Sequence, residues 1–136
     1  MHLRVIALTA LSAWTASAAV LKQDTALEKR DDYACNSAHA PGNPSDCDNL
    51  YNDIASGTAF ANLQTANPRT LRNGSCFVSW SNNVVGASQD LLPYISALKN
   101  GCTSQHESGI VKNVHLYGQS QATAICLSNR GTGCEN

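Results

Sequence analysis

The chain has little charge, few aromatic residues and no long hydrophobic run after its first twenty residues. Charged residues make up 14% of the 136 positions and aromatic residues 6%. After residue 30, eight acidic residues stand against five basic ones, a formal charge of −3. Because nucleic acids and anionic lipid surfaces attract proteins of the opposite sign, this balance argues against nucleic-acid binding and electrostatic membrane attack. Since no second segment of membrane length occurs, we also expect no stable membrane insertion.

Motifs that commonly mark catalytic or metal sites are missing as well. The sequence contains no Gly-x-Ser-x-Gly nucleophile motif and no Cys-x-x-Cys pair. The first absence disfavours a serine hydrolase of the α/β type, and the second disfavours a structural zinc site. We therefore expect no cofactor, no metal ion and no enzymatic activity.

The first thirty residues have the pattern of two removable segments. Residues 1–18 combine a basic start, a short apolar run and the small residues Ala16-Ser17-Ala18, as secretory signal peptides do. Residues 19–30 end in Lys29-Arg30, a dibasic pair that resembles the site cut by kexin-type proteases in fungal secretory pathways. We predict a signal peptide over 1–18, a propeptide over 19–30 and a mature domain over 31–136. The protein is therefore expected to be secreted and extracellular.

Every cysteine lies in the predicted mature domain. The six are Cys35, Cys47, Cys76, Cys102, Cys126 and Cys134. An even number of cysteines in a short exported chain predicts three disulfides, each stabilising the domain by roughly 2–4 kcal/mol. Six cysteines allow many pairings, and their spacing does not choose among them.

One motif predicts a covalent modification. Asn73-Gly74-Ser75 is the single N-glycosylation acceptor motif of the chain, and it directly precedes Cys76. We expect an exposed turn at this place, glycosylated on Asn73.

Two segments have the periodicity of amphipathic helices. Apolar residues at helical spacing are Cys47, Leu50, Tyr51 and Ile54 in the first, and Leu91, Leu92, Ile95 and Leu98 in the second. We expect Ser45 to cap the first helix and Gly57 to end it. The second is expected to begin near Ser88 or Asp90, with Pro93 in its first turn, and to end at Gly101.

The remaining apolar segments predict strands. These are a short strand at 70–72, a strand at 76–80 and a hairpin formed by 110–117 and 123–128, whereas the arm at 31–43 is expected to be irregular. Two helices that each have one apolar face need a sheet to cover. The sequence therefore predicts an α+β fold, a two-layer sandwich with two helices on one face of a small antiparallel sheet, held by three disulfides.

Few residues are candidates for chemistry. His106, Glu107, His115 and Arg130 contain the residue types of the acid–base site of a small secreted ribonuclease, but adjacent positions such as 106 and 107 point to opposite faces of a strand. We interpret His115 as a residue on the solvent side of its strand. Trp80 shares a strand face with Cys76 and is expected in the core, with anchoring of a target as the alternative. Trp80, Arg130 and His115 are our candidates for target binding.

Several short motifs resemble a known group of proteins. They are Asp46-Cys47-x-x-Leu50, Gly74-Ser75-Cys76-x-Val78-x-Trp80, Gly101-Cys102, Ser108-Gly109-x-Val111 and Cys126-Leu127-Ser128-Asn129-Arg130. Over residues 44–134 the chain resembles small cysteine-rich secreted proteins of filamentous fungi, some of which are grouped as WD-like domains. The order of elements is also similar to killer-toxin-like folds and to necrosis-inducing-factor effectors. The resemblance implies a non-enzymatic effector or toxin, with the six cysteines as disulfide partners, although killer toxins of this shape commonly have a basic surface.

The leading hypothesis from the sequence is a monomeric secreted binding protein that acts on another cell or host. Its partner would be an unknown protein or cell-surface target. One alternative is a small secreted hydrolase, which would depend on His106 and Glu107. Others are a structural protein associated with the cell wall, and a protease inhibitor that presents Lys99 or Arg69 on a loop.

Overall fold

The computed structural model describes residues 33–36, 39–59, 63, 69–84, 86–116 and 120–134. The predicted signal peptide, the predicted propeptide and the dibasic pair Lys29-Arg30 lie outside the described residues. In chain order the elements are β1 (Tyr33–Asn36), α1 (Pro44–Ala55), β2 (Thr70–Asn73), β3 (Cys76–Trp80), the 3₁₀ turn η2 (Ser88–Leu91), α2 (Leu92–Gly101), the 3₁₀ turn η3 (Thr103–Gln105), β4 (Ser108–Val114) and β5 (Thr123–Ser128).

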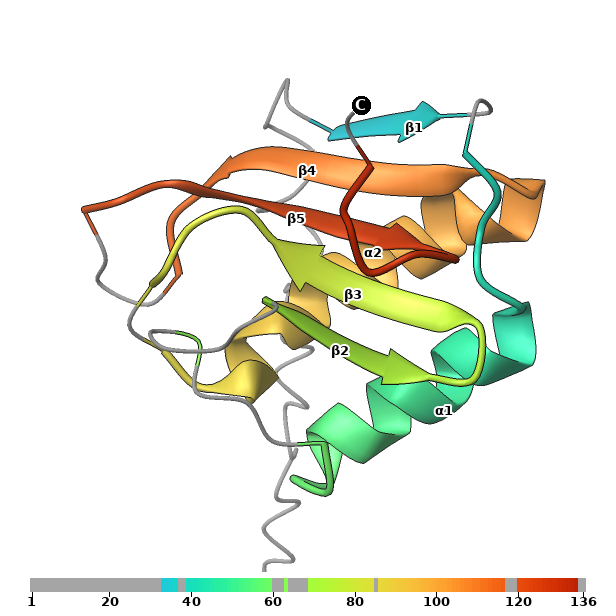
Figure 1. Cartoon of the computed structure of the whole chain (residues 1–136), viewed down its shortest axis with the longest axis horizontal. Coiled ribbons are helices and arrows are strands. Elements are labelled where there is room, and N and C mark those ends of the chain that lie inside the picture. The colour runs from blue at the N-terminus through green and yellow to red at the C-terminus, as the bar shows by residue number, and fades with distance from the viewer. Residues whose placement is uncertain are drawn as a thin grey trace, which may run out of the picture.

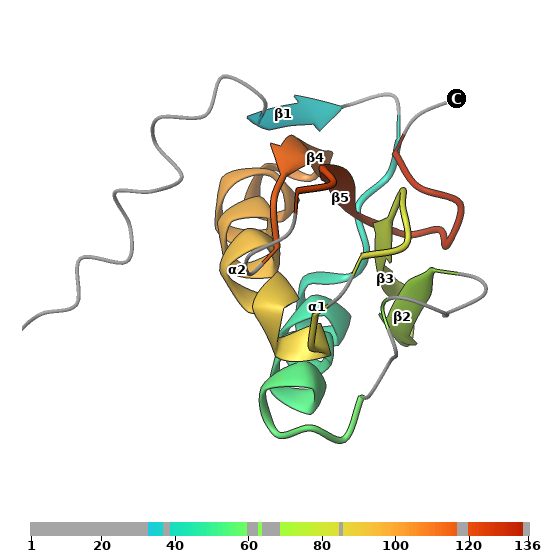
Figure 2. The same ribbon diagram turned by 90° about the vertical axis from the view of Figure 1, so that its left-hand side faces the viewer.

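The five strands form one antiparallel sheet in the order β1-β4-β5-β3-β2. Helix α1 packs against β2 and β3, and helix α2 packs against β4 and β5. Both helices lie on the same side of the sheet, as Figures 1 and 2 show. The predicted α+β fold, with two helices on one face of an antiparallel sheet, is therefore confirmed.

Helix α1 has the predicted apolar face but a different cap. Cys47, Leu50 and Ile54 are fully buried. The N-terminal cap is Asn43, whose Oδ1 accepts hydrogen bonds from the backbone N–H and the hydroxyl of Ser45 at 3.0 and 2.7 Å. Pro44 takes the first helical position, where its missing N–H has no cost. The prediction of Ser45 as the cap was therefore wrong, because the helix begins one residue before it.

Helix α2 begins with the 3₁₀ turn η2 and continues through Pro93, which is tolerated in the first helical turn as predicted. The helix lies very close to β4. A side chain at Gly109 would place its Cβ 2.7 Å from Leu98 Cδ2 and 2.8 Å from Cys102 Sγ. Glycine at this position therefore allows the helix to approach the sheet.

Two predictions about strands were wrong. The arm was expected to be irregular, but Tyr33–Asn36 pairs with β4 and forms an edge of the sheet. In β4, two residues lie opposite one between the pairs Val111–Ile125 and Val114–Thr123, which is a β-bulge that includes Asn113 with φ of 54°. The bulge changes the alternation of faces, so Ile110 lies in a different apolar cluster from Val111 and Val114. This strand was expected over 110–117, whereas β4 spans Ser108–Val114.

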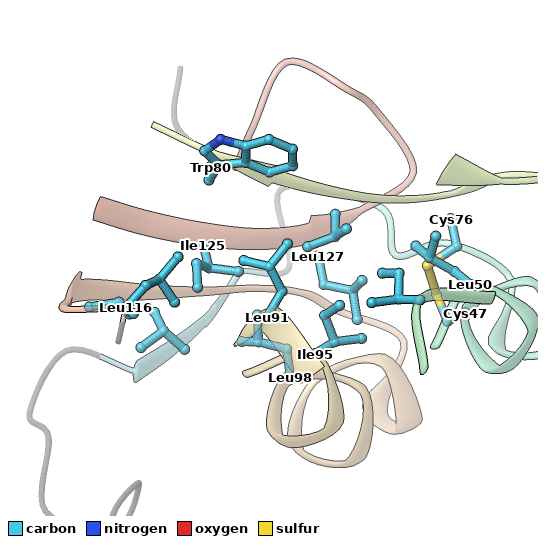
Figure 3. Packing of buried hydrophobic residues seen from close by; sticks show 14 of the residues in the cluster. Cys47, Leu50, Cys76, Trp80, Leu91, Ile95, Leu98, Leu116, Ile125 and Leu127 are labelled. Atoms are coloured by element: carbon cyan, nitrogen blue, oxygen red, sulfur yellow. A yellow bond between two sulfur atoms is a disulfide. The ribbon is translucent and has the colours of Figure 1, made fainter. Parts of the chain in front are cut away.

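The main core lies between the sheet and the two helices. Figure 3 shows Leu91, Ile95 and Leu98 of the α2 region facing Ile125 and Leu127 of the sheet. Their full burial removes apolar surface from water, which contributes roughly 1.5–3 kcal/mol for each such side chain.

All six cysteines are paired, so the prediction of three disulfides is confirmed. The pairs are Cys35–Cys102, Cys47–Cys76 and Cys126–Cys134. The first joins β1 to the end of α2, the second joins α1 to β3, and the third joins β5 to the C-terminal segment. Each disulfide thus joins a different pair of neighbouring segments of the fold.

Candidate functional site

The two faces of the sheet are covered differently. The helices cover one face, and the C-terminal loop, residues 129–134, lies over the other, which we call the outer face (Figures 1 and 2). A small apolar cluster on the outer face contains Ile110, Cys126 and Cys134, with Ala124 packed against it. The C-terminal loop therefore covers only part of this face.

The C-terminal loop is fixed by several bonds. The Cys126–Cys134 disulfide joins it to β5. The Nε–H of Arg130 donates to the carbonyl oxygen of Gly133 at 3.0 Å, and the Ser128 hydroxyl donates to the carbonyl oxygen of Arg130 at 2.9 Å. Gly133 has φ of +87°, a conformation that glycine adopts readily. These bonds give the loop a defined shape above the sheet.

Arg130 also connects the loop to the arm that precedes α1. Its Nη2 lies 2.9 Å from His39 Nε2, and the backbone N–H of Asn129 donates to the carbonyl oxygen of Ala40 at 3.2 Å. A guanidinium can only donate, so His39 Nε2 is the acceptor in this contact. Arg130 thus has a structural part in positioning the loop.

Between the C-terminal loop and the outer face lies a pocket of about 320 Å³. Its wall and floor come from five parts of the chain. The lining residues are Arg69, Ser79, Trp80, Ser81, Ile110, Ala124, Cys126, Gly131, Thr132, Gly133 and Cys134. The volume is at the lower end of the roughly 300–1,000 Å³ typical of ligand pockets. We call this cavity the outer-face pocket.

Among the described residues that line the outer-face pocket, one has a charged side chain, Arg69. Arg69 Nη1 donates to the carbonyl oxygen of Ser81 at 2.9 Å, and its own carbonyl oxygen accepts from the backbone N–H of Trp80 at 3.1 Å. The first contact restrains the guanidinium, and the second holds the Arg69 backbone beside β3. The pocket thus combines a fixed positive charge with an apolar floor.

Trp80 is buried, as the sequence predicted, with 4% of its surface exposed. It belongs to the main core cluster and also lines the outer-face pocket. Its indole N–H has no hydrogen-bond partner among the described residues, and Figure 3 shows this nitrogen turned away from the labelled leucines. A buried donor without a partner costs about 1–3 kcal/mol, so Trp80 is stabilised by its packing rather than by a polar contact.

The structure does not bring the predicted acid–base residues together. His106 ends η3 with φ of 62°, and Glu107 precedes β4, whereas exposed His115 follows the other end of β4. The seven-residue strand between them is about 20 Å long. Arg130 contacts His39, and no ion pair joins it to Glu107 within the described residues. A site that uses all four residues at once has no geometric support.

The residues suggested for protease inhibition are also held in place. Lys99 lies on helix α2, where it pairs with Asp48 and stands 5.5 Å from the centre of the Tyr51 ring. It is therefore not on a loop, and this part of the inhibitor hypothesis was wrong. Arg69 directly precedes β2 and is bound to Ser81.

The glycosylation motif forms the turn between β2 and β3. Gly74 and Ser75 are exposed, but Asn73 is half-buried and its Nδ2 donates to Asp53 Oδ2 at 2.7 Å. The exposed turn is thus present, while the amide that would carry a glycan already binds a carboxylate of helix α1.

The described residues contain no group of three or more metal-binding side chains. No helix in the same part of the chain is long and apolar enough to cross a bilayer.

Sequence reasoning named Trp80, Arg69 and Arg130 separately but did not find the outer-face pocket. Ser79 and the Gly131–Cys134 segment were not considered. One signal was present, since a cysteine pair only eight residues apart, with Gly131 and Gly133 between, favours a loop that folds back on its own strand.

Comparison with known proteins identifies the family of the chain. No curated protein and no solved structure matches the chain significantly. The family model described as Fungal WD-like matches residues 5–134. Because this match covers nearly the whole chain, the protein belongs to the fungal WD-like family.

Proposed function

We propose that the protein is a secreted, non-enzymatic binding protein, effector-like or killer-toxin-like, that acts on another cell or host. The observation that carries the proposal is the outer-face pocket, which is of ligand size and is closed by a disulfide. Three disulfides without a free cysteine are typical of extracellular proteins. The signal peptide and propeptide expected from the sequence are consistent with the same route.

The proposal includes the finer features expected from the sequence. The protein acts as a monomer on a protein or other cell-surface target, either free in the medium or associated with the cell wall. It carries a glycan on Asn73 that is added before the β2–β3 turn forms, since the folded turn occupies the amide. Its acidic balance supports a target other than nucleic acid.

The test is an assay of growth and viability with fungal and plant cells. Cells receive protein purified from the medium of an expressing fungus, either oxidised or reduced. We expect damage from the oxidised form only, because reduction removes the bonds that hold the pocket and the sheet edge. The variant His106→Ala should remain active, whereas a ribonuclease would lose activity. No effect of the oxidised protein on any cell would contradict the proposal and favour a structural role in the wall.

A further inference from the structure

We infer that the outer-face pocket binds a small carboxylic acid with an apolar body, and that the Arg69 guanidinium receives the carboxylate. The inference deepens the proposed function, since it takes this pocket as the binding site. It concerns the chemistry of the ligand, which can be measured without any target cell.

The charge of the pocket lining favours an anionic ligand. Among the described residues of the lining, Arg69 is the single charged one, and none of them is an aspartate or glutamate. Among the described residues Arg69 makes no ion pair with a carboxylate. A guanidinium has five N–H donors, and its contact with the Ser81 carbonyl oxygen involves Nη1 alone. Donors therefore remain for an anionic group in the cavity.

The geometry of Arg69 favours a carboxylate in particular. The guanidinium fork matches the two oxygens of a carboxylate, which allows two parallel charge-assisted hydrogen bonds. The bond to Ser81 restrains the fork before a ligand arrives. Less side-chain freedom is then lost on binding, so the site is preorganised.

The floor of the pocket specifies the rest of the ligand. Ile110, Ala124 and the Cys126–Cys134 disulfide form an apolar surface on the outer face of the sheet. An alkyl or aryl group lying on this surface would leave water, with a gain of about 25 cal/mol for each Å² buried. The volume of about 320 Å³ limits the ligand to a small molecule.

Other classes of ligand fit less well. A sugar presents many hydroxyl donors, but the described lining offers them the hydroxyls of Ser79, Ser81 and Thr132 and no carboxylate or amide side chain. A phosphate brings more negative charge than the single Arg69 balances, and it makes no use of the apolar floor. The combination of one cation and one apolar surface therefore favours a monocarboxylic acid.

The experiment compares two probes of equal chain length, hexanoate and 1-hexanol, by isothermal titration calorimetry with the oxidised secreted protein at pH 7. We expect hexanoate to bind about tenfold more tightly or better, because hydrogen bonds to charged groups contribute more than neutral ones. Equal binding of the two probes, or no binding of hexanoate at millimolar concentration, would overturn the inference. So would tighter binding of glucose or inorganic phosphate than of hexanoate.

Three variants assign the binding to the pocket. Arg69→Gln should weaken hexanoate binding by about tenfold or more and change hexanol binding by less than about twofold. Arg72→Gln is the matched control, since Arg72 is exposed on β2, stands 5.9 Å from the centre of the Phe77 ring and does not line the pocket. It should leave both affinities within about twofold of wild type. Ala124→Leu fills the floor and should abolish binding of both probes while the circular dichroism spectrum stays that of the wild type.

If Arg72→Gln weakens hexanoate binding as much as Arg69→Gln, the inference is wrong. The outcome of these binding measurements can be distinguished from the outcome of the cell assay that tests the proposed function. A protein that binds hexanoate but harms no cell keeps the pocket assignment and loses the proposed action, and a toxic protein that binds no acid does the opposite.

Discussion

Asp46 links helix α1 to the β2–β3 turn through a pair of short hydrogen bonds. The backbone N–H and the hydroxyl of Ser75 both donate to Asp46 Oδ2 at 2.8 Å, and Ser75 Oγ accepts from the backbone N–H of Asn43 at 3.0 Å. The backbone donor, followed by the hydroxyl, lowers the pKa of the Asp46 carboxyl below its usual 3.8, because both favour the charged form. The carboxylate is therefore bound more strongly in the folded protein than in the unfolded chain.

This pKa shift predicts a dependence of stability on pH. Because the pKa of Asp46 is lower in the folded state, its contribution is present above the usual pKa and is lost as the pH falls through the lowered value. The variant Asp46→Asn should therefore show a smaller decrease in the free energy of unfolding between about pH 4 and pH 2. Urea titrations at several pH values measure this. Ser75→Ala keeps the backbone donor and should give an intermediate result, whereas a wild-type slope in Asp46→Asn would refute the assignment.

Asn73 gives a second prediction for a single residue. Its amide donates to the Asp53 carboxylate at 2.7 Å, so Asn73→Asp would replace this bond by two carboxylates in contact. We expect a loss of about 1–3 kcal/mol in the free energy of unfolding at pH 7, and a smaller loss at pH 3, where carboxyl groups become protonated. Asn73→Ala removes the donor without adding charge and is the control. Equal losses in both variants at both pH values would show that charge repulsion has no part.

Among the elements, β1 depends most on a contact distant in the sequence. Its four residues pair with β4, and Cys35 is bonded to Cys102 across a sequence separation of 67. The Tyr33 side chain contributes little to holding this strand, because its hydroxyl makes only weak contacts. It lies 3.4 Å from the Ala97 carbonyl oxygen and 3.2 Å from the disulfide sulfur Cys102 Sγ. The strand is therefore held mainly by its ladder and by the disulfide.

Removal of the Cys35–Cys102 disulfide should release this edge strand. The double variant Cys35→Ala with Cys102→Ala is expected to lose about 4 kcal/mol of stability, because the opened loop is long. Amide hydrogen exchange should become faster in β1 and along the facing edge of β4, and remain slow in β3. The matched control is Cys126→Ala with Cys134→Ala, which opens a loop with a separation of only 8 and should leave exchange in β1 unchanged. Protected β1 amides without the first disulfide would contradict the prediction.

Some elements could be predicted from the sequence and others could not, and the difference has a physical reason. Helix α1, β3 and the β4–β5 hairpin follow from local patterns, since spacing of apolar residues and turn residues specify them within a short segment. β1 is short and has no strong alternation, so its conformation is decided by pairing with a strand far along the chain. The bulge at Asn113 likewise depends on the register with β5. Such tertiary effects do not appear in a local pattern.

The candidate site was predictable only in part for the same reason. Trp80 and Arg69 drew attention as single residues, one as a buried aromatic and the other as a loop cation. The outer-face pocket combines them with Ser79 on β3 and with Gly131 in the C-terminal loop. This combination exists only after the C-terminal loop folds over the sheet, and the sequence left the disulfide pairing that fixes this loop undecided.

At the scale of the whole molecule, the sheet separates the main core from the candidate binding site. The face toward the helices holds the main core, while the outer face holds the small cluster around Ile110 and the pocket beneath the C-terminal loop. Two disulfides attach β1 to α2 and α1 to β3, and the third attaches the C-terminal loop alone. Changes in the third disulfide should therefore affect the pocket more than the fold.

This separation predicts that removal of the third disulfide gives a protein that still folds but no longer binds hexanoate tightly. The double variant Cys126→Ala with Cys134→Ala should lose about 2–3 kcal/mol, as expected for a short loop, and keep the amide protection of its core strands. Its hexanoate affinity should fall by at least about tenfold, because without the disulfide the lining from Gly131 to residue 134 is no longer fixed over Ile110 and Ala124. Calorimetry and hydrogen exchange on one preparation measure both effects. Full affinity in this variant would mean that Arg130 and its contact with His39 hold the loop without help from the disulfide.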